Sequence, residues 1–352
     1  MILSLPRLDA PARRTRLSNP TIARRARFVA AFVLPGVVAF ASRAAQANPY
    51  VELSWIAGMG KNGTSFAVPL SVAIDPRRGD VAIANTGRGR IEILAPDGSA
   101  SVFFDHRVRG ADGNSVLGKP RVVRFDAAGR LLVTDDLDAG VDILDYRGRV
   151  IGRLEIPSTA DGAEPADTVA GAVLPLKDGS VLVATRSKRG RIHRFDGSGR
   201  WIGAWGESGT KPGQLARITS LAQAPSGEIL VACSATELAI QRFNQNGSYV
   251  AGFGQHEIGT GNFSFPSGIA VTADGRIWVS DQLRQTVQIF SAKGEYEGTA
   301  GEGGPQPGAF LFPSDVATDG KDRLAVVERV GVRVQMFRIL DPEAMFRAPE
   351  RR

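Results

Sequence analysis

Residues 265–281 read FPSGIAVTADGRIWVSD and contain the pattern that decides the fold. An apolar segment, 268–271, leads into Asp274-Gly275, a dipeptide that permits the positive φ angles of a tight turn. Residues 276–280, RIWVS, then form a second short segment with an apolar centre, as strands packed between sheets do. The stretch therefore predicts two antiparallel strands. A loop and a second glycine turn separate two more predicted strands, Thr286–Phe290 and Tyr296–Ala300.

The same pattern occurs six times along the chain. The copies begin at Pro69, Pro120, Ala170, Ile218, Pro266 and Pro313, at intervals of 51, 50, 48, 48 and 47 residues. A regular period of this length, with several short strands in each unit, is typical of a β-propeller. The sequence therefore predicts an all-β fold, a six-bladed propeller with four-stranded antiparallel blades.

The last copy lacks a fourth strand, since RILDPEAMFRAPERR follows Phe337. The missing strand is available at the other end of the propeller, because residues 50–66 resemble residues 295–310 in having an apolar strand before a glycine-rich segment. We therefore expect residues 51–56 to complete the last blade and close the ring, which leaves no open strand edge between the chain ends. The propeller should occupy residues 48–340, followed by a polar tail, 341–352.

Residues 1–47 have the features of an export signal. They contain eight arginines and one acid, so the rest of the chain carries no net charge out of the total of +7. An apolar run, 28–41, follows RRAR and precedes Ala45-Gln46-Ala47, which resembles a signal-peptidase site. The paired Arg24-Arg25 resembles a twin-arginine signal, although the spacing is imperfect. The sequence thus predicts export to the periplasm or the extracellular space, with no stable transmembrane segment after cleavage.

Residues 254–271, GQHEIGTGNFSFPSGIAV, and 279–290, VSDQLRQTVQIF, resemble the two halves of the NHL repeat. The resemblance extends over residues 50–337 and is weak in the third and fourth copies, where the strand-end acid is replaced by Thr185 and Cys233. It implies a six-bladed propeller that binds proteins or, in some animal members, RNA. A related branch, the peptidyl-α-hydroxyglycine lyases, is zinc-dependent, so the resemblance leaves the choice of function open.

One polar position recurs at the end of the second strand of each copy. Its occupants are Asn85, Asp135, Thr185, Cys233, Asp281 and Glu328. The favoured interpretation is structural, with side chains that accept backbone N–H bonds from the adjoining loops. The alternative is a ring of oxygen ligands for a cation at the channel mouth, to which Asp315 could add. Cys233 is predicted to be buried and inert.

Basic residues gather in the loops that follow these strand ends. The candidates for an anion-binding surface are Arg88, Arg186, Lys188, Arg189, Arg284 and Arg329. The simpler interpretation is a set of solvated loops. Nucleic acid is disfavoured, because the propeller carries no net charge and these loops lack aromatic side chains that could stack on bases.

The three histidines do not predict a zinc site, because His106, His193 and His256 lie in unrelated contexts. We therefore predict no catalytic residue, metal or cofactor. The preferred function is an exported, monomeric, non-catalytic scaffold that presents its interblade crossovers to a protein or glycan partner. The longer crossovers, 105–119 and 156–167, are the expected contact sites. The alternative is a metal-dependent lyase or hydrolase with its site at the channel mouth.

Overall fold

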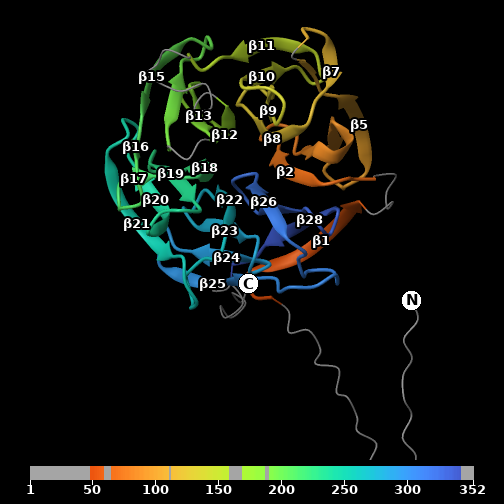
Figure 1. Ribbon diagram of the computed structural model, residues 1–352. Coiled ribbons are helices and arrows are strands. Elements are labelled where there is room, and N and C mark those ends of the chain that lie inside the picture. The colour runs from red at the N-terminus through yellow and green to blue at the C-terminus, as the bar shows by residue number, and fades with distance from the viewer. Residues whose placement is uncertain (1–47, 59–64, 111, 158–168, 187–189, 342–352) are drawn as a thin grey trace, which may run out of the picture. The chain divides into compact units, whose positions relative to one another are not determined.

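The computed structural model describes residues 48–58, 65–110, 112–157, 169–186 and 190–341. The chain separates into two units, Met1–Gln46 and Ala47–Arg352. The second unit contains six four-stranded antiparallel sheets arranged around a common axis (Figure 1). The six-bladed propeller that the sequence predicts is therefore confirmed.

The strands of each blade follow one another outward from the axis. Blade one holds β2 (Pro69–Ile74), β3 (Val81–Asn85), β4 (Arg90–Leu94) and β5 (Ala100–Asp105). Blade two holds β8 (Pro120–Phe125), β9 (Leu131–Asp135), β10 (Val141–Leu144) and β11 (Val150–Leu154). Blade three holds β12 (Ala170–Pro175), β13 (Val181–Thr185), β14 (Ile192–Phe195) and β15 (Trp201–Trp205). Blade four holds β18 (Ile218–Gln223), β19 (Ile229–Cys233), β20 (Leu238–Phe243) and β21 (Tyr249–Gln255). Blade five holds β22 (Pro266–Val271), β23 (Ile277–Asp281), β24 (Thr286–Phe290) and β25 (Tyr296–Ala300).

Blade six is built from both ends of the propeller. It holds β26 (Pro313–Thr318), β27 (Arg323–Glu328) and β28 (Arg333–Ile339), and its outer strand is β1 (Val51–Gly58). β1 pairs antiparallel with β28, from Val51 opposite Ile339 to Gly58 opposite Arg333. Figure 1 shows the orange β1 beside the blue β28. The predicted ring closure is confirmed, and the closing strand runs two residues further than 51–56.

Apolar side chains fill the spaces between neighbouring blades. Between blades four and five, for example, the buried cluster includes Leu230, Ile240, Phe263, Ile277 and Phe290. Full burial of each such side chain contributes about 1.5–3 kcal/mol. The second strands, such as β3 and β23, are buried along their whole length, because each blade buries one face against each neighbour.

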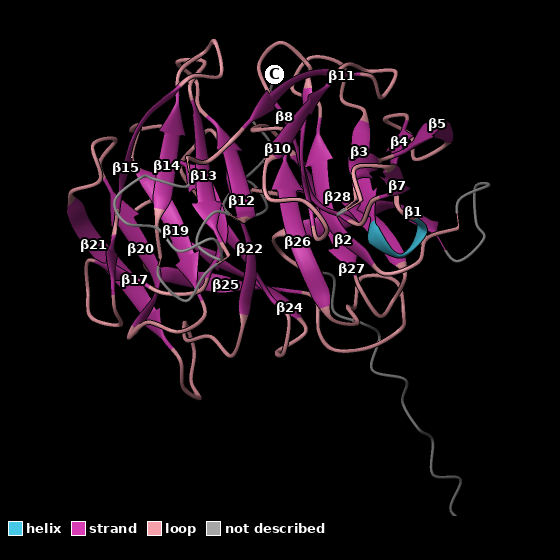
Figure 2. Ribbon diagram, turned by 45° about the horizontal axis from the view of Figure 1, so that its top comes forward, coloured by secondary structure: helices cyan, strands magenta, loops and turns pink. Residues whose placement is uncertain are grey.

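Three short elements lie outside the four-stranded sheets. A 3-10 turn, η1 (Thr86–Arg88), follows β3, and a small parallel pair joins β16 (Glu207–Ser208) to β17 (Gln214–Leu215). The predicted long crossover 105–119 contains a hairpin, β6 (Arg107–Arg109) and β7 (Ser115–Leu117), whereas most of 156–167 lies outside the described residues (Figure 2). No described helix has the length and apolar character needed to cross a membrane.

Candidate functional site

The polar residues at the ends of the second strands bind the crossover backbone. In blade five, the buried Asp281 accepts hydrogen bonds from the amides of Ser264 at 2.7 Å, Phe265 at 3.0 Å and Arg284 at 3.1 Å. Its carboxylate thus satisfies donors that would otherwise be left unpaired where the chain enters the blade.

Two other blades repeat this arrangement. Asn85 accepts from the amide of Ala67 at 2.8 Å, and Glu328 accepts from the amide of Leu311 at 2.7 Å. Glu328 also binds Arg333 at 2.6 Å. These side chains are buried and do not line the cavity on the axis. The strand-end set therefore turns toward the crossovers and not into the channel.

In blade two, Asp135 accepts from the amide of Leu137 at 2.8 Å and also binds an imidazole. His106 Nδ1 lies 2.8 Å from Asp135 Oδ2, and its Nε2 lies 3.2 Å from Asp142 Oδ2. Burial alone would lower the pKa of His106, but hydrogen bonds and charges from Asp135 and Asp142 outweigh it and raise the pKa to about 9. Arg153 binds Asp142 at 2.6 Å and also pairs with Asp138. The result is a buried ion cluster.

His193 and Cys233 are also buried, and their surroundings keep both uncharged at pH 7. His193 accepts from Trp201 Nε1 at 3.2 Å, and burial lowers its pKa to about 4, so it is neutral at pH 7. Burial raises the pKa of the Cys233 thiol to about 12. Among the residues that the structure describes, no three His, Cys, Asp or Glu side chains are placed so that they could hold a metal ion together.

A cavity of about 590 Å³ lies on the propeller axis. Residues from all six inner strands line it, and its rim is formed by residues that follow the second strands, such as Thr86, Asp136 and Gln282. Its volume falls within the range of about 300–1,000 Å³ that is usual for small-molecule sites. The cavity is therefore the channel mouth, on the side where the crossovers enter the blades.

Four arginines surround this mouth: Arg121, Arg186, Arg217 and Arg329. They come from blade two, from the loop after β13, from the residue before β18 and from the loop after β27, respectively. Asp136 Oδ1 accepts from Arg186 at 2.7 Å and from Arg121 at 3.3 Å. Burial and the nearby charge of Arg186 lower the pKa of Arg121, and Arg329 adds to the effect. The guanidinium groups of Arg121, Arg186 and Arg329 therefore lie near enough to repel one another.

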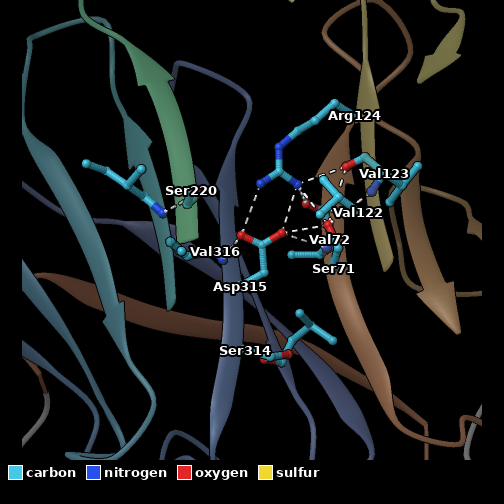
Figure 3. A network of polar contacts seen from close by, with 12 residues as sticks. Ser71, Val72, Val122, Val123, Arg124, Ser220, Ser314, Asp315 and Val316 are labelled. Atoms are coloured by element: carbon cyan, nitrogen blue, oxygen red, sulfur yellow. Dashed lines mark hydrogen bonds and ion pairs between the residues drawn. The ribbon is translucent and has the colours of Figure 1, made fainter. Parts of the chain in front are cut away.

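An ion pair between side chains of two inner strands forms the floor of the cavity (Figure 3). Arg124 of β8 binds both oxygens of Asp315 of β26, at 2.8 and 3.2 Å. Ser71 of β2 lies between them and donates to Asp315 at 2.7 Å. Gly268 leaves the space for this contact, because a Cβ there would lie 2.6 Å from Asp315 Oδ1. The pair joins blades two and six across blade one.

The predicted basic residues lie in different surroundings in the structure. Arg186 and Arg329 line the channel mouth. Arg88 instead donates to Ser65 Oγ at 2.7 Å, and Arg284 donates to the carbonyls of Gly259 and Glu257 at 2.8 and 2.6 Å. Lys188 and Arg189 lie outside the described residues.

Of the predicted polar ring, Asp315 differs from the rest in position. It lies on an inner strand in the cavity floor, whereas Asn85, Asp135, Asp281 and Glu328 end second strands. The sequence interpretation missed Arg121, Arg124 and Arg217. Reading the six copies in columns would have shown Arg121, because it shares its column with Thr219, Ser267 and Ser314.

Comparison with known proteins supports the fold. A model of the NHL repeat matches residues 263–290. In sequence, no curated protein matches the chain. A gluconolactonase from Xanthomonas campestris is 15% identical with a TM-score of 0.53, and the match covers 83% of this chain and 88% of that one. A virginiamycin B lyase from Staphylococcus aureus is 10% identical with a TM-score of 0.56, over 82% of this chain and 100% of that one.

A third solved structure, a Bacteroides thetaiotaomicron protein of unknown function, is 15% identical with a TM-score of 0.59 and matches 82% of this chain and 76% of that one. At such identities the likeness shows the fold alone. The repeat match lies in blade five, on the stretch whose pattern recurs in all six blades. The chain therefore contains an NHL repeat at residues 263–290, within a six-bladed β-propeller fold.

Proposed function

We propose that this protein is an exported, non-catalytic binding propeller that holds an anionic ligand at its channel mouth. The observation that carries the proposal is the convergence of four guanidinium groups on one cavity. Five arginines and two aspartates line it, which leaves a local charge of +3 on a propeller with no net charge. A cleft of one charge sign concentrates ligands of the opposite sign.

Two of the four arginines are available to a ligand. Asp136 engages Arg121 and Arg186, whereas the side chains of Arg217 and Arg329 form no ion pair or hydrogen bond with another described residue. Both of these residues are exposed. A guanidinium group offers paired N–H donors that match a carboxylate. Arg217 and Arg329 therefore supply the binding energy. Asp136 offsets part of the positive charge of the other two arginines when no ligand is bound.

The scaffold proposal includes the location and the partner. The signal-like segment 1–47 would deliver the propeller, 48–340, to the periplasm or the outside of the cell. The ligand would be presented by, or belong to, a protein or glycan that contacts the interblade crossovers around the same mouth. A processed N-terminus at Asn48 and a monomeric mass in solution are the expected results of terminal sequencing and light scattering.

The alternative is a metal-dependent lyase or hydrolase at the same mouth, which the similarity in fold to a gluconolactonase and a lyase brings forward. The residues around the cavity do not favour it. Its carboxylates are Asp136 and Asp315, and both are engaged by arginines. Stoichiometric zinc or calcium in the purified protein would support the alternative and contradict the non-catalytic proposal.

Titration calorimetry with the full chain at low salt tests the anion site. The probes are phosphate, citrate, D-glucuronate and cyclohexanecarboxylate. We expect at least one to bind, with an affinity that falls as salt is added. Replacing both Arg217 and Arg329 by Gln should weaken binding at least tenfold, while Asp136→Asn should strengthen it by releasing two guanidinium groups.

Arg88→Gln is the matched control, because it removes an exposed arginine of the same loop set that lies outside the cavity. It should change affinity by less than about twofold, and thermal melting should show that all variants fold. Failure of all four probes to bind at millimolar concentration would sink the proposal.

A further inference from the structure

The channel mouth has a second polar arc, made of hydroxyl groups. The second residue of the inner strand is Thr219 in blade four, Ser267 in blade five and Ser314 in blade six. All three line the cavity. Blades one to three carry no hydroxyl in this column, where Leu70, Arg121 and Gly171 stand. At this position, the inner strands of blades four to six therefore carry hydroxyls and those of blades one to three do not.

The protons of these hydroxyls are directed at backbone carbonyls. Thr219 Oγ1 donates to the carbonyl of Ala232 at 3.2 Å. Ser314 Oγ lies 3.3 Å from the carbonyl of Pro69 and 3.4 Å from that of Val327.

Ser267 Oγ lies 2.9 Å from the carbonyl of Pro313, 3.1 Å from that of Ser280 and 2.9 Å from Ser280 Oγ, so its acceptors all belong to the protein. Thr86 on the rim follows the pattern, with its hydroxyl 2.6 Å from the carbonyl of Pro120. The backbone thus fixes the orientation of hydroxyls from four blades.

A hydroxyl has one proton and two acceptor lone pairs, so a hydroxyl that has already donated can only accept. The arc therefore presents acceptors to the cavity, while the arginines present donors alone. A ligand that satisfies both must accept hydrogen bonds at one end and donate them at the other. A carboxylate accepts, and alcohol groups donate.

We propose that the ligand of the channel mouth is a hydroxylated carboxylate, a sugar acid such as a uronic acid. Its carboxylate binds Arg217 and Arg329, and its hydroxyls donate to Thr219, Ser314 and their neighbours. This inference rests on the proposed function, since it names the class of anion for the same site. A site built to pair with ligand hydroxyls discriminates strongly against an analogue that lacks them, because its polar groups are then left without partners.

Two probes of equal charge and ring size test the proposal. D-Glucuronate carries ring hydroxyls, and cyclohexanecarboxylate carries none. In calorimetry with the full chain, we expect D-glucuronate to bind at least tenfold more tightly. Binding of both with similar affinity overturns this inference and leaves the anion site intact, whereas binding of no anion overturns the proposed function as well.

A double variant, Thr219→Val with Ser314→Ala, separates the contribution of the hydroxyl groups from that of the arginines. It should reduce the preference for D-glucuronate to within about threefold and leave the affinity for cyclohexanecarboxylate unchanged. Thr299→Ala is the control, because that hydroxyl lies on the outer strand of blade five and pairs with Tyr296. A preference that survives the double variant contradicts the proposal.

A short polyuronate distinguishes the source of the ligand. If three linked uronates bind more tightly than the monomer, the mouth holds the end of an acidic glycan; if they bind less tightly, it holds a free sugar acid. Either result is consistent with the class of ligand, and loss of D-glucuronate binding in the Arg217→Gln, Arg329→Gln double variant is required in both cases.

Discussion

In blades five and two, the same two positions of the repeat, at the end of the second strand and in the third strand, bind different partners. In blade five, the carboxylate of Asp281 takes backbone amides, and Gln288 Nε2 donates to the carbonyl of Asn262 at 2.7 Å. In blade two, the equivalent residues are Asp135 and Asp142, and one imidazole, His106, lies between them. The positions in the repeat are identical, but the partners are not.

The crossovers explain this difference. The crossover into blade five is short and glycine-rich, so its backbone can reach the strand end and the third strand directly. The crossover into blade two includes the β6–β7 hairpin, and a side chain takes over the contact. In blade five, Asp281 binds backbone amides and lies 3.6 Å from Arg284, whereas blade two adds a buried, protonated histidine to its backbone contacts. The comparison thus predicts different sensitivities to mutation and to pH.

The largest effect is expected for His106→Gln. The substitution leaves two buried carboxylates, Asp135 and Asp142, without their shared cation, and Arg153 contacts only the latter. Removal of one partner of a buried ion pair costs about 3–5 kcal/mol. Urea unfolding should show a loss of this size in the free energy of unfolding.

His256→Gln is the matched control, because His256 lies in the crossover into blade five and is exposed. Its effect should stay within about 0.5 kcal/mol. Equal losses for the two variants would contradict the ionic description of blade two.

The pH dependence should follow from the same cluster. The pKa of His106 is about 9 in the folded protein and 6.5 when unperturbed, so its contribution is complete below pH 6.5 and is lost as the pH rises through 9. At about 1.4 kcal/mol per pKa unit, the loss is on the order of 3 kcal/mol. The midpoint of urea unfolding, measured from pH 6 to 10, should fall in the wild type.

The decrease of the urea midpoint with rising pH should be smaller in His106→Gln, and this difference would attribute the decrease to His106. His193 acts in the opposite window, because its pKa is lowered to about 4 and its contribution is lost as the pH falls below 6.5. A wild-type midpoint that does not change between pH 7 and 9.5 would show that His106 is not charged in the folded protein.

Most of the fold could be predicted because each signal is repeated. A single Asp-Gly turn is weak evidence, but glycine turns in register at intervals of 47–51 residues leave little choice of architecture. Ring closure could also be predicted, since residues 50–66 have the pattern that the last copy lacks. The His106 cluster could not, because the hairpin in its crossover has no counterpart among the described residues of the other crossovers.

The arginines of the channel mouth were harder to predict from the sequence, for a geometric reason. The register shifts near the start of every inner strand, as between Pro120 and Val122 in β8. After such a bulge, period-two counting no longer tells which residues face the axis. Arg121 and Arg124 therefore could not be assigned to the channel from alternation, whereas Arg186 and Arg329 follow a strand end and were identified.

The smallest effect is expected for Asp281→Asn in blade five. The amide keeps one acceptor oxygen, but its NH2 group must face the N–H of either Ser264 or Phe265. In blade one, Asn85 is tolerated because its NH2 donates to Glu92 Oε1 at 2.6 Å. Blade five has Gln288 in place of Glu92, and its own NH2 group already donates to Asn262.

One buried donor is therefore left without an acceptor in Asp281→Asn, at a cost of about 1–3 kcal/mol. The free energy of unfolding should fall by this amount, and the amides of Ser264 and Phe265 should exchange hydrogen faster. The double variant Asp281→Asn, Gln288→Glu recreates the pair of blade one and should recover part of the loss. If it recovers none, the third-strand partner does not decide which polar residue a strand end accepts, and blades two and five would differ only in their crossovers.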